Sequence, residues 1–152
     1  MTFKKILCPI DFSEDSQRAI QVAAEIARNS QATLVLLYVW QPLQWMTDYG
    51  MQWPNEVLLE AQVIEEGKLA TYRVDARRLG APEVVTKLLR GEPWDQIVSV
   101  ARDDRAIDLI VMGTHGRTGL RHALIGSVAE RVVRHAPCTV MVVRAPQSKQ
   151  PE

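Results

Sequence analysis

Five short apolar runs alternate along the chain with longer segments whose apolar residues recur every three or four positions. Four of the runs are rich in β-branched residues and are bounded by polar or turn residues, which is typical of strands buried on both faces of a parallel sheet. The fifth run is less regular. The predicted strands are Lys5–Ile10, Thr33–Val39, Glu83–Leu89 (the less regular one), Leu109–Met112 and Thr139–Val143.

The longer segments carry the signals of four helices. Ser13 is suited to cap the first helix, and the two acidic residues that follow it favour the positive end of the helix dipole. Pro93 is well placed as a first helical residue. The helices are predicted to begin after Ser13, near Pro54, at Pro93 and near Ser127; the second ends at about Leu79 and the fourth before Pro137.

Strands that alternate with helices favour a parallel sheet covered by helices on both faces, with right-handed crossovers. A chain of 152 residues has room for one domain of ordinary size, and neither a repeat nor a linker divides it. We therefore expect one α/β domain over residues 1–144, doubly wound around a five-stranded parallel sheet. Residues 145–152 are polar with two prolines, and we expect a disordered tail there.

Composition restricts the class of protein further. Lys plus Arg equals Asp plus Glu, 18 against 18, so the net charge gives no reason to expect binding to nucleic acid or to an anionic membrane. No apolar run approaches the roughly 18 residues that span a bilayer, and the one near the N-terminus is too short for a signal peptide. The two cysteines, Cys8 and Cys138, fall in predicted buried strands and form no disulfide framework. These features predict a cytoplasmic protein.

A glycine-rich segment follows the fourth strand, where a ligand site is expected. Ligands of open parallel sheets bind at the carboxyl ends of the strands. Glycines at 113, 116 and 119 permit positive φ and close approach of backbone to a ligand, and Gly126 and Ser127 stand where a helix begins. The unpaired N–H groups of a helix N-terminus suit a phosphate. A flexible loop followed by a self-capped helix is the alternative interpretation.

The pattern Gly113-x-x-Gly116-(nine residues)-Gly126-Ser127 resembles the ATP-binding signature of the universal stress protein family. The first strand with its Asp11-x-Ser13 turn and the final strand from Pro137 to Val143 are similar to the same family. The resemblance covers roughly residues 3–144. It implies a Rossmann-like fold of the adenine-nucleotide alpha hydrolase type that usually dimerises and, in this branch, binds ATP.

The resemblance also implies a set of cofactor-binding residues. It puts adenine beside Asp11 and the main chain of Val39, and it puts ribose and phosphates along the glycine motif. No acidic pair adjoins that motif, so Mg²⁺ is expected to be carried by the phosphates themselves. The residues assigned to ATP in this way are Pro9, Asp11, Val39, Met112, Gly113, Gly116, Arg117, Gly126, Ser127 and Val128.

Alternatives stay open at two of these positions and in one loop. Asp11 can equally form a side-chain turn before the first helix, and Arg117 can be a solvated loop residue. His115, within the glycine segment, is expected to have no catalytic role. The loop from Trp40 to Trp53 is rich in tryptophan and methionine, and it is interpreted as local core, a lid or a partner surface.

Three functions compete on this evidence. The leading one is an ATP-binding regulator of stress or energy state with little or no catalysis. The others are a slow ATPase or adenine-nucleotide hydrolase, and an interaction module that binds no nucleotide. The chain lacks a Walker loop, which weighs against the enzyme. The expected partners are ATP, a second copy of the chain bound through the last strand, and an unidentified protein; neither nucleic acid nor a membrane is expected.

Overall fold

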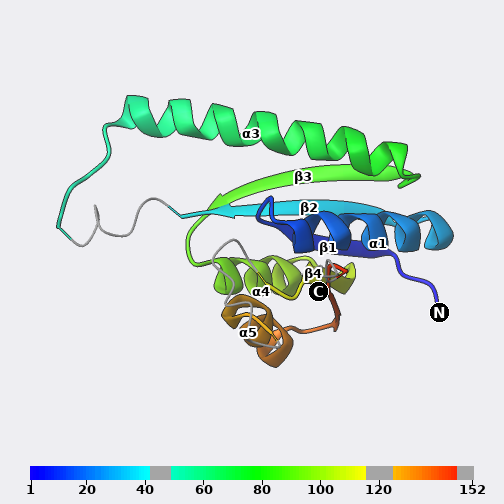
Figure 1. Cartoon of the computed structure of the whole chain (residues 1–152). Coiled ribbons are helices and arrows are strands. Elements are labelled where there is room, and N and C mark those ends of the chain that lie inside the picture. Colours follow the sequence, from blue (N-terminus) through cyan, green and yellow to red (C-terminus); the bar gives the residue numbers. More distant parts are fainter. Residues whose placement is uncertain (42–48, 116–124, 147–152) are drawn as a thin grey trace, which may run out of the picture.

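The computed structural model describes residues 1–41, 49–115 and 125–146, and all of these ranges contribute to one layered arrangement (Figure 1). Five strands alternate with helices along the chain. The elements are β1 (Lys5–Ile10), α1 (Glu14–Ser30), β2 (Thr33–Trp40), α3 (Asn55–Arg78), β3 (Glu83–Arg90), α4 (Pro93–Asp103), β4 (Ile107–Gly113), α5 (Ser127–His135) and β5 (Thr139–Val143).

The strands form one parallel sheet in the order β3-β2-β1-β4-β5. The chain builds outward from β1 through β2 to β3, then crosses back to β4 and continues to β5. The strand order therefore reverses between β1 and β4, and ligands of such sheets bind beyond the carboxyl ends of the strands at this point. The predicted five-stranded, doubly wound α/β fold is confirmed.

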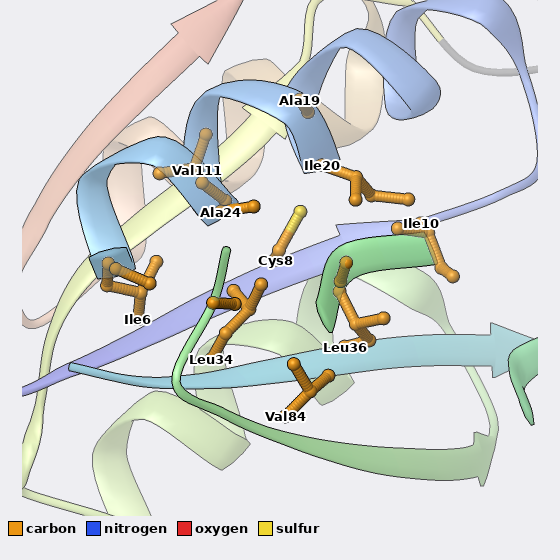
Figure 2. Packing of buried hydrophobic residues seen from close by; sticks show 14 of the residues in the cluster. Ile6, Cys8, Ile10, Ala19, Ile20, Ala24, Leu34, Leu36, Val84 and Val111 are labelled. Carbon is orange, nitrogen blue, oxygen red and sulfur yellow. The ribbon is translucent and has the colours of Figure 1, made fainter. Parts of the chain in front are cut away.

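Helices cover both faces of the sheet, because successive residues of a buried parallel strand point to opposite sides. Figure 2 shows one side, where Ile6, Cys8 and Ile10 of β1 pack with Leu34 and Leu36 of β2 beneath α1. α3 covers the same face over β2 and β3 (Figure 1). The neighbouring Leu7 points to the other face, which α4 and α5 cover.

Alanines let α1 lie close to the sheet. Ala19, Ala23, Ala24 and Ala27 recur at helical spacing and are almost completely buried. Ser13 caps this helix as predicted, since its hydroxyl accepts a hydrogen bond from the backbone N–H of Ser16. The amino end of α1 is thereby fixed directly after β1.

The two edge strands differ from the central ones. We expected Thr139–Val143 to be a fully buried strand, and this prediction was wrong: every residue of β5 is exposed or half-buried. The reason is that β5 lies at the edge of the sheet. Cys138 precedes β5 and is only half-buried, so its predicted place inside a buried strand was also wrong. Cys8 is fully buried in β1, and burial raises the pKa of both thiols.

Two sequence expectations extend beyond the described residues. The predicted disordered tail begins at Ala145, and its residues 147–152 lie outside the described residues. Residues 42–48, in the middle of the tryptophan-rich loop, also lie outside them. In the part of the chain that is described, no helix combines the length and hydropathy required to cross a bilayer.

Candidate functional site

A cavity of about 610 Å³ opens beyond the carboxyl ends of β1, β2 and β4. Its wall combines the turn after β1, the end of β2, the segment after β4 and the first turns of α4 and α5. It therefore occupies the place in the sheet where the strand order reverses. The residues around it are Pro9, Ile10, Asp11, Ser16, Leu37, Tyr38, Val39, Gln41, Pro93, Ile97, Met112, Gly113, Thr114, His115, Ile125, Gly126, Ser127, Val128, Ala129 and Glu130.

The turn after β1 is held by hydrogen bonds between its own residues. A carboxylate oxygen of Asp11 accepts from the backbone N–H of Ser13 at 3.0 Å, and the Ser16 hydroxyl donates to the Ser13 carbonyl at 3.0 Å. The side-chain turn considered for Asp11 is therefore present. Asp11 also lines the cavity, so a structural role and a ligand role are compatible at this position.

Phe12, between Asp11 and Ser13, has a φ of 64°, a conformation that is costly for a bulky side chain. Its ring packs against Tyr38 and Tyr72 with centroid distances of 4.7 and 5.2 Å, and the Lys68 ammonium lies 5.5 Å from the ring centre. These contacts hold the backbone in the left-handed region. The turn therefore directs Phe12 into the packing between the sheet and α3 while Asp11 stays at the cavity.

Gly113 is required by close packing. Its backbone has no positive φ, so the conformational freedom proposed for it from the sequence is not used here. A Cβ at this position would lie 2.8 Å from the Asp15 Cβ and 2.9 Å from the Asp15 carbonyl carbon. Only glycine lets the first turn of α1 approach the end of β4 so closely.

Asp15 connects the cavity to the far edge of the sheet. One of its carboxylate oxygens accepts from the backbone N–H of His115 at 2.9 Å, and the other accepts from the N–H of Ala145 at 3.2 Å. The same side chain lies 3.4 Å from the imidazole Nδ1 of His115. Asp15 thus fixes both the segment after β4 and the chain that leaves β5. Sequence reasoning missed this role, because it saw Asp15 only as a favourable charge in a first helical turn.

Gly126 brings the start of α5 against the segment after β4. Its N–H donates to the Thr114 carbonyl at 2.7 Å, and a Cβ would lie 3.0 Å from that oxygen. As the N-cap, glycine offers no side chain to the first N–H groups of α5, whereas Ser13 does so for α1. In this part of the structure Ser127 and Val128 therefore present backbone N–H groups at the cavity, an arrangement that favours an anion.

Another part of the cavity wall is apolar. Val39 and Met112 are the next-to-last residues of β2 and β4, and Ile97 of α4 lies among the same lining residues. All three side chains are almost fully buried. A cavity that combines apolar side chains with backbone N–H groups suits a ligand with a flat hydrophobic part and an anionic part.

The structure brings together eight of the ten residues assigned to ATP from the sequence: Pro9, Asp11, Val39, Met112, Gly113, Gly126, Ser127 and Val128 all line the cavity. Gly116 and Arg117 lie outside the described residues. Sequence reasoning did not find Ile97 or Gln41. Ile97 was predicted only to lie on the buried face of a helix. Nothing in the sequence around it indicates that this face borders a cavity.

Metal ligands do not cluster in the described ranges: no group of three or more His, Cys, Asp or Glu side chains there is arranged to hold a metal ion. Glu130, an acid that lines the cavity, is paired with Arg134 at 2.6 Å.

The fold and the position of this cavity define the class of doubly wound α/β proteins, and comparison with known proteins identifies the family. The model of the universal stress protein family matches residues 2–144. A universal stress protein of Methanocaldococcus jannaschii is 38% identical over 151 residues, covering 97% of this chain and 85% of its own length. The chain belongs to the universal stress protein family, as its sequence motifs predicted.

Solved structures agree with this assignment. Universal stress protein UspA from Lactobacillus plantarum superposes with a TM-score of 0.80 at 29% identity, covering 95% of this chain and 99% of its own. A universal stress protein from Archaeoglobus fulgidus, solved in complex with dAMP, gives a TM-score of 0.66 at 26% identity, with coverage of 94% and 99%.

Proposed function

We propose that this protein is an ATP-binding regulator that responds to stress or energy state, with little or no catalysis of its own. One observation carries the proposal: the N-terminus of α5, which has no side-chain cap, lines one cavity together with the Gly113–His115 segment and with apolar side chains. The Archaeoglobus relative in complex with dAMP supports an adenine nucleotide as the ligand class.

Each part of ATP has a matching part of the cavity. The adenine ring lies against Val39 and Met112, with Asp11 near its polar edge. The phosphates lie against Gly113, Gly126 and the first N–H groups of α5, where the helix dipole favours negative charge. Gly116 and Arg117 complete the phosphate side in this proposal. Mg²⁺ arrives with the phosphates, because Asp and Glu side chains of the described residues form no ligand cluster.

A charge placed at the start of α5 tests the phosphate position. Ser127→Asp favours the helix, because an acidic residue suits its first turn, but the new carboxylate repels phosphate. We expect the variant to keep the thermal stability of the parent while its ATP affinity in titration calorimetry falls at least about 10-fold, equivalent to about 1.4 kcal/mol.

Ser127→Asn is the matched control, since it changes the side chain without adding charge. It is expected to retain ATP affinity within a few-fold. Equal affinity of the Asp variant and the parent would remove ATP phosphates from this end of the cavity.

The identity of the nucleotide that copurifies with the protein tests whether bound ATP is hydrolysed. Denaturing freshly purified protein and chromatographing the supernatant is expected to release ATP. Release of ADP or AMP would point to hydrolysis, and release of no nucleotide would favour an interaction module.

The proposal includes a homodimer formed through β5. It also includes an unidentified protein partner that recognises the ATP-bound form. β5 is an edge strand whose other side pairs with β4, so its outer backbone groups are available to a second copy. We also place the protein in the cytoplasm, a reducing compartment that suits the free thiols of Cys8 and Cys138.

A further inference from the structure

The outer surface of α3 carries a second apolar stripe that its own fold does not use. The side of the helix that faces the sheet is marked by buried and half-buried residues such as Leu58, Leu69 and Ala76. On the other side Leu59, Val63 and Val74 are 61%, 67% and 48% exposed. α3 is the outermost element on this side of the molecule (Figure 1).

The spacing of this stripe is that of a helix-packing seam. Leu59, Val63, Gly67, Ala70 and Val74 follow one another at intervals of three or four residues, and all five are exposed. Such intervals keep side chains on one face along the whole helix. We call these five residues the outer stripe.

A glycine in the middle of the stripe has no explanation within one chain. Gly67 lies near the centre of a 24-residue helix, where glycine costs about 1 kcal/mol relative to alanine. A Cβ at Gly67 would meet nothing within 4 Å. With Ala70 one turn further on, it leaves a shallow place where a second helix could approach closely.

The charges along α3 show what kind of helix fits. Its first part carries Glu56 and Glu60, and its last turns carry Arg73, Arg77 and Arg78. A copy of α3 in the same direction would set like charges side by side, whereas an antiparallel copy sets the acidic end against the basic end.

The stripe is symmetric about the point between Glu66 and Gly67. Val63 and Ala70 lie at equal distances on either side of it, as do Leu59 and Val74. The same holds one turn further out for Glu56 and Arg77. A two-fold related, antiparallel pair therefore sets Val63 opposite Ala70, Leu59 opposite Val74 and Glu56 opposite Arg77, with Gly67 opposite Glu66 at the centre. Matching of a surface with itself in this way is the requirement of an interface between identical chains.

We propose that the outer stripe of α3 is a self-association surface that pairs antiparallel with α3 of a second copy of this chain. The surface is separate from the edge strand β5 and from the cavity, and the inference does not rest on ATP binding. Its limited apolar area makes the association weak and concentration-dependent.

Disulfide trapping between two separately prepared variants tests both the surface and its direction. Val63→Cys and Ala70→Cys are each made in a Cys138→Ser background, with Cys8 left buried. In the antiparallel pair residue 63 lies opposite residue 70 of the other copy, and two copies of residue 63 are about 10 Å apart along the helices. Bridging requires Cα atoms within about 7 Å.

We therefore expect mild oxidation of the mixture to give a 63–70 disulfide between chains, identified by peptide mass mapping, while each variant alone stays uncrosslinked. Ile64→Cys mixed with Ala70→Cys is the matched control. Ile64 is 60% exposed like Val63, but it points about 100° away round the helix, so little cross-link is expected. Self-crosslinking of Val63→Cys, or equal trapping by the Ile64 control, would overturn the proposal.

Charge reversal supplies an independent readout. Glu56→Lys and Arg77→Glu each place like charges together in the pair, so each alone is expected to weaken association about 3- to 10-fold in sedimentation equilibrium. The mixture of the two restores opposite charges and is expected to recover parental association. Failure of the mixture to recover would exclude the antiparallel register. Val142→Pro in β5 should leave both results unchanged, which separates this surface from the edge strand.

Discussion

Asp15 shows how much one side chain can hold together in this fold. Its carboxylate accepts hydrogen bonds from His115 and Ala145, which belong to segments about 100 and 130 residues away. Hydrogen bonds to a charged group contribute more than neutral ones, and their loss leaves the two N–H groups without this acceptor. Asp15 therefore links α1 to the cavity wall and to the chain that follows β5.

Replacing Asp15 by alanine is expected to lower the free energy of unfolding by about 2 to 3 kcal/mol. It is also expected to weaken ATP binding, because the segment after β4 loses its anchor. Urea denaturation and calorimetry measure the two effects. Glu14→Ala is the control: Glu14 is exposed in the same helical turn, and its loss should cost less than about 1 kcal/mol. Equal costs for the two variants would contradict the anchoring role.

Two glycines are expected to respond to the same substitution with opposite signs. Gly113→Ala places a methyl group within 3 Å of Asp15, and overpacking of this kind costs about 1 to 3 kcal/mol. Gly67→Ala adds a methyl group to open space in a helix and should stabilise the fold by up to about 1 kcal/mol. Thermal unfolding at low protein concentration compares them; stabilisation by Gly113→Ala would refute the close packing.

Local signals at single residues predicted part of the site. The Ser13 cap and the turn of Asp11 rest on contacts between residues three or fewer apart, so the sequence shows them directly. Gly113 was singled out for positive φ, whereas its actual constraint is contact with Asp15 on another element. A contact across nearly 100 residues has no local signature, and for this reason the ties of Asp15 were missed.

At the scale of elements, β5 combines an ordered inner side with an open outer side. The Val143 carbonyl accepts from the N–H and the hydroxyl of Thr114, so this residue directs its backbone toward β4. Backbone groups alternate in direction along a strand, so the N–H of Val142 points to the open edge. β5 therefore offers outward N–H groups without giving up its pairing with β4.

Val142→Pro is expected to convert a β5-paired dimer to monomer, because proline removes an outward donor that a second copy would use. Light scattering measures the mass, and circular dichroism checks that the fold persists. Val140→Pro, the other outward position, should act in the same way. A stable dimer in both variants would place the interface elsewhere.

Strand and helix positions were predicted closely because their patterns are local. β1 and β5 have the predicted bounds, β2 and β3 each extend one residue further, and β4 begins two residues earlier and ends one residue later than predicted. The burial of β5 was not predictable, since an apolar run looks the same at the centre and at the edge of a sheet. Strand order decides exposure, and it depends on how distant segments pair.

At the scale of the whole molecule, the cavity walls come from both halves of the sheet. β1 and β2 supply one part, and β4 with α5 supplies the other. A ligand that touches both halves binds only the folded chain and must stabilise it as a unit.

ATP at about 100 times its dissociation constant is expected to add about 2.7 kcal/mol to the free energy of unfolding, which raises the melting temperature by about 5 to 10 °C. Differential scanning fluorimetry with and without ATP measures the shift. Ser127→Asp, whose ATP affinity is expected to be at least about 10-fold lower, should show no more than about half of this shift under the same conditions. An unchanged melting temperature in the parent protein would count against nucleotide binding.

The strand order also bears on how the chain is made. β1 leaves the ribosome first, yet it lies in the middle of the sheet with β4 as its second neighbour. During synthesis β1, β2 and β3 can pair early, while the other edge of β1 stays open until Ile107–Gly113 has emerged. An unfinished chain therefore presents an unpaired apolar edge to its surroundings, a state that invites association with other nascent chains. This exposure ends when β4 has emerged and paired with β1.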